Sequence, residues 1–212
     1  NTTSCVQQIF ITDEQAPVIA CPGNITLECS ESTDPANTGR ASAVDNCTSQ
    51  DEIAITYSDD LSGLTGCNQT GQLVRTWTAE DLCGNTTTCV QNISIRDAQS
   101  PVIVCPAEIT VRCDESLDPA VTGFATATDN CTPSAGIALT YQDFRNGAPG
   151  CSGPATVNRQ WTASDACGNT ATCFQTINIL PTPDPTITCP PDVVLSCDDP
   201  VQPGSTGVPT VN

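Results

Sequence analysis

Cysteine positions recur along this chain at one constant spacing, the step from Cys5 to Cys89 and again from Cys89 to Cys173. This period constrains the fold more than any other feature of the sequence. The stretches WTAEDLCGN and WTASDACGN align in the same register without a gap. A strict period of this size indicates a tandem array in which each repeat is one structural unit. The repeated columns are Cys5/Cys89/Cys173, Cys21/Cys105/Cys189, Cys29/Cys113/Cys197, Cys47/Cys131, Cys67/Cys151 and Cys83/Cys167.

The register divides the chain into two complete repeats, 14–97 and 98–181, and two partial ones. Residues 1–13 match the end of a repeat, and residues 182–212 match the beginning of one. We therefore expect the sequence to be a segment of a longer array. The partners of the leftover cysteines would then lie outside this segment.

Composition narrows the class of protein. Fifteen cysteines in 212 residues, with no C-x-x-C pair of the kind that binds zinc, indicate disulfides and an extracellular or cell-surface location. His and Lys are absent, which removes the commonest general base and every lysine nucleophile, so we expect no enzyme activity. The net charge of −18 disfavours nucleic acid and anionic membranes as partners, and no apolar run is long enough for membrane insertion.

Short β-type stretches separated by Gly, Pro, Asn and Asp predict an all-β fold. Strands of this number in a unit the size of 14–97 predict tandem immunoglobulin-like β-sandwich repeats. The core of each would be thin, around Tyr57 and Trp77 in the first repeat, so we expect three disulfides per repeat, worth about 2–4 kcal/mol each, to compensate. The strands expected in the first repeat are 17–21 with 25–29, then 40–44, 53–57, 73–78 and 88–95.

An up-and-down strand path assigns the cysteines to the two ends of a repeat and so predicts their pairing. A sequential alternative, Cys29–Cys47 with Cys67–Cys83, would span the length of a strand, whereas a disulfide needs Cα atoms within about 7 Å. The long loop 30–39 could still permit it, so the alternative stays open. The predicted pairs are Cys21–Cys89, Cys29–Cys67 and Cys47–Cys83 in the first complete repeat, and Cys105–Cys173, Cys113–Cys151 and Cys131–Cys167 in the second.

Aspartates at strand tips form a second repeated pattern. Asp45 and Asp81 end two strands at one end of the first repeat, and the linker residue Asp13 is expected beside them. Three carboxylates at a joint between repeats could hold Ca²⁺, which prefers oxygen ligands. Alternatively each aspartate caps its own turn, and no EF-hand spacing supports calcium. The equivalent residues of the second repeat are Asp97, Asp129 and Asp165.

Seven N-x-S/T sequons make covalent glycans a further expectation. Asn46 and Asn130 suit this modification less, because a cysteine lies inside each of their sequons. Trp77 and Trp161 could stack on sugars, but their mid-strand positions favour a core role. The candidate glycosylation sites are Asn1, Asn24, Asn68, Asn85 and Asn92.

The motifs PVIxCP, the mid-repeat DN pair and WTAxDxCGNTxTC resemble hyalin-repeat-like modules, an immunoglobulin-like family of extracellular proteins. The cysteine-rich tandem versions in large bacterial surface proteins are more similar still. The resemblance covers the whole chain and implies cell-surface adhesion or matrix assembly without enzymatic activity. The third copy departs from the pattern, since PTPDP at 181–185 replaces DAQSP and predicts a stiffer linker.

Together these features predict a structural segment of a secreted or cell-surface fibre or matrix protein, a rigid disulfide-stapled and glycosylated rod. The expected partners are neighbouring repeats of the same chain, then lateral copies or surface glycans. Two alternatives stay open, the stalk of an adhesin and a carbohydrate-binding module. The stretch 61–72 varies most against its counterpart 144–156, as a binding loop on a constant frame would.

Overall fold

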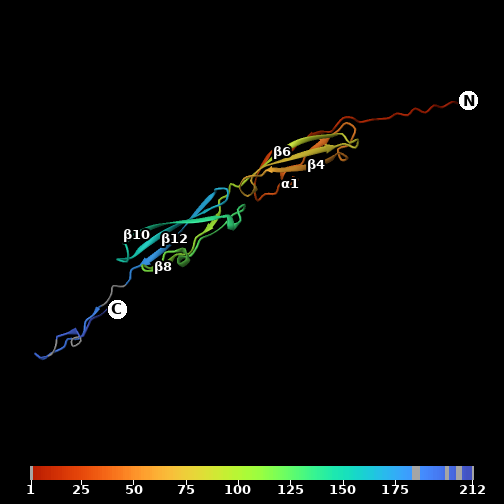
Figure 1. The fold of residues 1–212 in the computed structure, drawn as a ribbon. Coiled ribbons are helices and arrows are strands. Elements are labelled where there is room, and N and C mark those ends of the chain that lie inside the picture. The colour runs from red at the N-terminus through yellow and green to blue at the C-terminus, as the bar shows by residue number, and fades with distance from the viewer. Residues whose placement is uncertain (1, 183–186, 199–200, 204–206, 212) are drawn as a thin grey trace. The chain divides into compact units, whose positions relative to one another are not determined.

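The computed structural model describes residues 2–182, 187–198, 201–203 and 207–211, and it is built mainly of strands (Figure 1). Asn1 and most of the proline-rich segment 181–185, for which the sequence analysis made predictions, lie outside the described residues. The chain forms two compact units. One comprises the residues up to 105 with 125–141 and 161–173, and the other comprises 106–124, 142–160 and the described residues from 174 onward.

The first repeat contains a four-stranded sheet in the order β2-β6-β5-β4 and a two-stranded sheet of β1 with β3. β2 runs parallel to β6, whereas β5 is antiparallel to both of its neighbours. This arrangement confirms the predicted all-β sandwich. The elements are β1 (Val18–Ala20), β2 (Ile25–Glu28), α1 (Pro35–Thr38), β3 (Ser42–Val44), β4 (Ala54–Gly63), the 3-10 turn η1 (Cys67–Gln69), β5 (Gly71–Glu80) and β6 (Thr86–Arg96).

The second repeat has the same strand order, displaced by one period. Its four-stranded sheet has the order β8-β12-β11-β10, and β7 pairs with β9. The elements are β7 (Val102–Val104), β8 (Ile109–Arg112), α2 (Pro119–Thr122), β9 (Thr126–Thr128), η2 (Ser134–Gly136), β10 (Ala138–Gly147), β11 (Ala155–Ser164) and β12 (Thr170–Leu180). A short antiparallel pair, β13 (Ile187–Thr188) and β14 (Thr210–Val211), follows.

Hydrophobic burial in the first repeat is confined to a few side chains. Alternate residues of β5 are buried, as the two-residue period of a strand requires, and Leu73 packs with Leu27 and Ile93. Trp77 is also buried, as predicted. The expectation that Tyr57 belongs to the core is wrong: its side chain is 46% exposed and leans on the Trp77 ring, because β4 is an edge strand exposed along its whole length.

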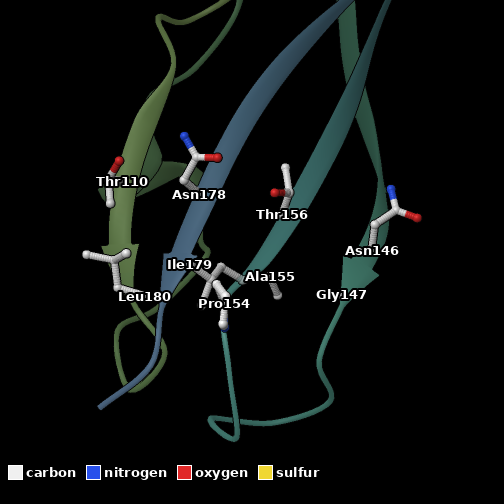
Figure 2. Close-up of a pocket in the computed structure, with 9 residues that line it drawn as sticks. All are labelled: Thr110, Asn146, Gly147, Pro154, Ala155, Thr156, Asn178, Ile179 and Leu180. Atoms are coloured by element: carbon white, nitrogen blue, oxygen red, sulfur yellow. The ribbon is translucent and has the colours of Figure 1, made fainter. Parts of the chain in front are cut away.

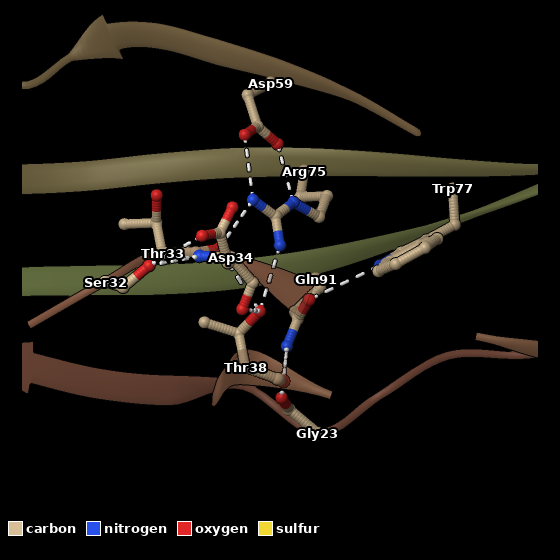
Figure 3. Close-up of polar contacts among 9 residues, drawn as sticks. All are labelled: Gly23, Ser32, Thr33, Asp34, Thr38, Asp59, Arg75, Trp77 and Gln91. Carbon is tan, nitrogen blue, oxygen red and sulfur yellow. Dashed lines mark hydrogen bonds and ion pairs between the residues drawn. The ribbon is translucent and has the colours of Figure 1, made fainter. Parts of the chain in front are cut away.

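A buried arginine occupies the position in β5 between Leu73 and Trp77. The Arg75 side chain is 1% exposed and forms a two-pronged ion pair with Asp59 of β4, Nε to Oδ1 at 2.7 Å and Nη2 to Oδ2 at 2.8 Å (Figure 3). Nη1 also donates to Thr38 Oγ1 of α1 at 2.9 Å. Such a paired fork compensates the cost of removing the charge from water. Asp59 accordingly raises the pKa of Arg75.

Gln91 of β6 extends this polar network to the other side of the core. Its Nε2 donates to the carbonyls of Thr38 at 2.7 Å and Gly23 at 3.0 Å, and its Oε1 accepts from Trp77 Nε1 at 3.3 Å (Figure 3). Arg75 and Gln91 therefore tie the four-stranded sheet to the α1 loop. The second repeat keeps the arginine fork and the glutamine-to-carbonyl contact of this network, through Arg159, Asp143, Thr122 and Gln175.

Replacing Arg75 by methionine should lower the free energy of unfolding by about 3 kcal/mol, because the change leaves Asp59 and Thr38 without their partner. The matched control is Arg96→Met. Arg96 is 65% exposed and its Nε lies 3.4 Å from Glu28, so this change should cost less than about 1 kcal/mol. Urea unfolding of the oxidised chain compares the two, and equal small losses would contradict a structural role for the buried fork.

Candidate functional site

Two disulfides join the first complete repeat to the second. Cys29, directly after β2, is bonded to Cys131, with Cα atoms 5.8 Å apart. Cys67, at the start of η1, is bonded to Cys167, with Cα atoms 5.3 Å apart. All four cysteines belong to the same compact unit, and we call this four-cysteine contact the joint. Consecutive repeats are thus connected by two covalent bonds in addition to the backbone.

The disulfides of the joint differ from the cysteine pairing that the sequence predicted. Cys29–Cys67 and Cys131–Cys167 are not formed, and neither is the sequential alternative for the first repeat. The prediction assumed that each repeat satisfies its own cysteines. A strict period cannot test that assumption, because shifting a partner by one whole period leaves every cysteine column unchanged.

Three other disulfides lie within single repeats, at pairings that the sequence analysis expected. Two of them connect the start of a repeat, after its first short strand, to its last long strand, β6 or β12. We call this bond the clasp of the repeat. The three bonds are Cys21–Cys89 and Cys105–Cys173, which are the clasps, and Cys113–Cys151.

Cys47 and Cys83 are exposed free thiols, so the predicted bond between them is not formed. They occupy the same columns as Cys131 and Cys167, which are bonded across the joint. Three further described cysteines, Cys5, Cys189 and Cys197, are also exposed and free.

Polar contacts accompany the disulfides of the joint. Asn68 Nδ2 donates to Thr132 Oγ1 at 2.7 Å, and this threonine is 1% exposed and also accepts from the Ala166 N–H. Asn68 has a φ of 49°, a left-handed conformation that asparagine tolerates better than most residues. Asn130 Nδ2 lies 3.4 Å from Ser30 Oγ. The joint is therefore specific in its hydrogen bonding as well as in its disulfides.

The aspartates predicted to converge in the first repeat do so. Oxygen atoms of Asp13, Asp45 and Asp81 lie within 4.8 Å of one another. The capping interpretation also holds for all three. Asp13 Oδ1 accepts from the Gln15 N–H, and Asp45 Oδ1 accepts from the Cys47 and Thr48 N–H groups. Oδ1 of Asp81 likewise accepts two backbone N–H groups of its own turn.

Unsatisfied oxygens remain in this first triad. Oδ2 of Asp13 and of Asp45 is buried and accepts no hydrogen bond from the described residues. Backbone N–H groups of Thr48 and Cys47 lower the pKa of Asp45. Burial opposes ionisation of Asp81, but hydrogen bonds from Asn85 outweigh it, so the pKa of Asp81 is also lowered. Carboxyl oxygens that accept no other hydrogen bond are chemically suited to Ca²⁺, and calcium binding stays a prediction.

The three aspartates predicted to converge in the second repeat do not form such a group, because Asp165 is not among the ligand atoms that cluster there. Ligand atoms of Asp97 and Asp129 group with the sulfur of Cys131, which is engaged in a disulfide and so is not a thiolate ligand. Oδ2 of both aspartates is buried without a hydrogen-bond partner among the described residues. Burial, and then the charges of Asp129 and Asp165, raise the pKa of Asp97.

A pocket of about 570 Å³ lies in the second unit, at the ends of β8, β10, β11 and β12 (Figure 2). Its polar side chains come from Thr110, Asn146, Thr156 and Asn178, and the rest of its lining is small or apolar. None of its lining residues is titratable or aromatic. The pocket can therefore form hydrogen bonds with a polar ligand, but it offers neither acid–base catalysis nor a ring on which a sugar could stack.

The candidate glycosylation sites differ in how their side chains are engaged. Asn24 and Asn68 are exposed, whereas Asn85 and Asn92 are half-buried. Asn85 Nδ2 already donates to the Asp13 carbonyl and to Asp81 Oδ2, so a glycan, which replaces one of its two N–H groups, would remove at least one of these bonds. Glycosylation stays a prediction, and Asn24 has the least encumbered amide nitrogen.

The tryptophans do not form a sugar-stacking surface. Trp77 and Trp161 are each 2% exposed, and each contacts the tyrosine opposite it, Tyr57 at 5.2 Å and Tyr141 at 5.1 Å between ring centroids. Sequence reasoning missed the arginine beside each of them. The signal was present, because Arg75 and Arg159 share one column and fall in register with the inward-facing residues of β5 and β11.

No protein-family model and no curated protein matches the chain. Solved structures similar to it include protocadherin gammaB7 EC3-6, 12% identical with a TM-score of 0.36, covering 83% of this chain and 51% of that one. Protocadherin gamma B2 domains 3-6 is 14% identical with a TM-score of 0.37, and the match covers 80% of this chain and 52% of that one. Drosophila N-cadherin EC1-4 is 12% identical with a TM-score of 0.34, and the match covers 78% of this chain and 49% of that one. The chain thus spans about half the length of these structures. Among the described residues, no helix is long and apolar enough to cross a membrane.

If the triads bind calcium, millimolar Ca²⁺ should raise the melting temperature of the chain, because a ligand at a hundredfold its Kd adds about 2.7 kcal/mol to folding stability. Asp13→Asn should abolish this rise at the first triad, whereas Asp60→Asn, which lies outside both triads, should leave it intact. Calorimetry in calcium and in chelator provides the measurement. Identical melting in the two would end the calcium interpretation.

Asp97→Asn should stabilise the calcium-free chain at pH 7. A carboxyl group whose folded pKa is raised contributes stability below its unfolded pKa and loses that contribution as the pH rises through the folded value. The gain from the substitution should therefore vanish in acid. The opposite effect on stability is expected at Asp60. The N–H and hydroxyl of Ser62 lower the pKa of Asp60, so Asp60→Asn should destabilise the chain at pH 7. Thermal melts of both variants at pH 7 and pH 3 test this contrast.

Proposed function

We propose that this chain is a load-bearing structural segment of a secreted or cell-surface fibre or matrix protein. The observation that carries the proposal is the joint, where Cys29–Cys131 and Cys67–Cys167 connect consecutive repeats by two covalent bonds. Disulfides of this density belong to an oxidising, extracellular compartment. An array whose units are cross-linked at every joint resists bending and separation in a way that a single linker does not.

The clasps supply the second part of the argument. Tension applied along the chain passes from Cys21 to Cys89 through one disulfide, along the segment 89–105, and through the bond Cys105–Cys173. The segments 22–88 and 106–172 lie outside this path, whereas most of β6 and β12 lies within it. The two disulfides of the joint run in parallel with the segment 89–105 and offer second and third routes for the force.

A carbohydrate-binding role is the second candidate, supported by the amide and hydroxyl groups of the pocket, such as Asn146 and Thr156. The chain has no His or Lys, and the pocket is lined by no titratable residue, so an enzyme is the class with least support. The adhesin-stalk alternative shares the mechanics of the fibre and differs only in what the array presents.

Pulling the chain by its two ends in a single-molecule force experiment tests the mechanical proposal. The oxidised chain should show no large lengthening step, because the clasps keep most of each repeat out of the force path. Loss of the first clasp alone should release little chain, because the Cys29–Cys131 route remains. Only loss of that clasp together with both joint disulfides should release the first repeat as one large step.

The first variant, Cys21→Ser with Cys89→Ser, removes the clasp. The second variant removes both joint disulfides by replacing all four of their cysteines with serine, Cys29, Cys67, Cys131 and Cys167. The third variant combines the two sets. A large step in the intact oxidised chain would overturn the load-bearing role. Electron cryomicroscopy of native, unreduced material separates fibre from stalk. Filaments with an axial spacing of one or two repeats support the fibre, whereas short rods ending in a different globular domain support the stalk.

A further inference from the structure

Two phenylalanine rings of the second repeat are exposed on its four-stranded sheet, β8-β12-β11-β10. The Phe144 side chain, on the edge strand β10, is 43% exposed, and that of Phe174, on β12, is 63% exposed. Both residues belong to the second compact unit. Aromatic residues are only 4% of this chain, so two exposed rings on one sheet are a feature that needs a reason.

The alternation of side chains along a strand directs both rings away from the core. In β12, Ile177 is buried, so Phe174, three positions earlier, points to the opposite face. In β10, Asp143 binds the buried Arg159, so the next residue, Phe144, also points to the opposite face. We call the outward positions of β8, β10, β11 and β12 within the second unit the outer face.

The rest of the outer face offers amide and hydroxyl groups. Figure 2 shows four of these side chains one beside the next across the four strands, where they line the pocket of about 570 Å³. Asn178 Nδ2 donates to Glu108 Oε1, which leaves the Asn178 carbonyl oxygen as an acceptor. The outward polar side chains are Thr110, Asn146, Thr156, Asn158, Gln160 and Asn178, and none of them is charged.

The first repeat shows that a following repeat does not cover this face. Thr26, Gln72 and Ser94 occupy the columns of Thr110, Thr156 and Asn178. All three are exposed, although the complete second repeat follows them in the chain. The outer face of a repeat therefore remains accessible when another repeat is attached.

The first repeat lacks the rings themselves. Asp60 stands in the column of Phe144, Val90 stands in that of Phe174, and Arg96 adds a cation to the same sheet. The stretch 144–156, which varies most against its counterpart 61–72, contains part of the outer face. The two repeats thus share a frame, and the second has exchanged charge on this face for aromatic and amide groups.

We propose that the outer face of the second repeat binds a neutral polysaccharide. The hydroxyl groups of a sugar both donate and accept hydrogen bonds, which the amides and hydroxyls of this face can match. The Phe144 and Phe174 rings provide apolar surface for the C–H faces of the sugar rings. A polyanion is disfavoured, because the face has no cation to pair with it and the chain has a net charge of −18.

This inference deepens the second candidate function, carbohydrate binding, by giving it a face and a ligand class. The pocket alone offers no ring, whereas the face that contains it offers two. The load-bearing role does not depend on this face, because the joint and the clasps are formed by other residues.

Electrophoresis of the full oxidised chain through native gels that contain a dissolved polysaccharide tests the proposal. The probes are a mannan, a xylan, a dextran and a β-glucan, each in a separate gel, with alginate as the polyanionic control. At least one neutral polysaccharide should retard the chain increasingly with its concentration, whereas alginate should not.

The rings are tested by giving the second repeat the residues of the first. Phe144→Asp with Phe174→Val should weaken binding roughly tenfold or more, because the apolar contact with the sugar is lost. The matched control is Phe124→Arg, which also replaces an exposed ring by its first-repeat counterpart but lies outside the four-stranded sheet. It should leave binding unchanged, and thermal melting verifies that both variants are folded.

The polar groups are tested by Thr156→Val, which removes a hydroxyl while keeping the shape of the side chain. Binding should weaken roughly fivefold, the equivalent of one hydrogen bond. A second variant, Gln72→Val, makes the corresponding change on the first repeat and should have no effect.

Three outcomes contradict the proposal. The chain is retarded by none of the neutral polysaccharides, or the ring variant is retarded as strongly as the unmodified chain, which would place sugar binding elsewhere. In the third, sedimentation without sugar shows a dimer that the ring variant loses, which would make the face a contact between proteins. None of these outcomes changes the lengthening steps under force, so the load-bearing role is judged separately.

Discussion

The disulfides at the ends of each repeat are the constraint on which the rest of this structure depends. The apolar core of the first repeat consists of small clusters, such as Leu27, Leu73 and Ile93, and a sandwich of this size gains limited stability from burial alone. Cross-links restrict the unfolded chain instead, by an amount that grows with the length of the closed loop. The joint bonds close loops of 100 and 102 residues in sequence separation, so they constrain two repeats at once.

The buried arginine network also compensates for the small number of apolar residues in the core. Where a larger sandwich would place an aliphatic side chain, this one places Arg75, whose charge is satisfied by Asp59 and whose remaining N–H groups bind Thr38 and the Thr33 carbonyl. The guanidinium also lies 4.4 Å from the centroid of the Tyr57 ring. Hydrogen bonds with fixed directions thereby orient the α1 loop against the sheet, which a few aliphatic contacts would leave less well defined.

Much of the fold could be predicted from the sequence, because the period and the turn residues locate the strands independently of tertiary structure. The clasp Cys21–Cys89 was accessible for the same reason, since both cysteines lie beside strands whose direction follows from the path of the chain. The joint was not, because a periodic sequence contains no information on whether Cys29 bonds within its repeat or beyond it. Burial of Arg75 was also missed, since a charged side chain is ordinarily expected at the surface even where its register in the strand points inward.

The reach of the joint disulfides, from one repeat into the next, has a consequence for how such a gene can change in length. Duplication or deletion of a whole number of repeats preserves a joint of this kind, because the two cysteine columns on each side of it move together. A deletion that removes only one of two paired columns, such as that of Cys131 without that of Cys29, would instead leave a thiol without its partner. Changes in length by whole repeats therefore preserve the joints, which agrees with the unbroken register of the cysteine columns in this sequence.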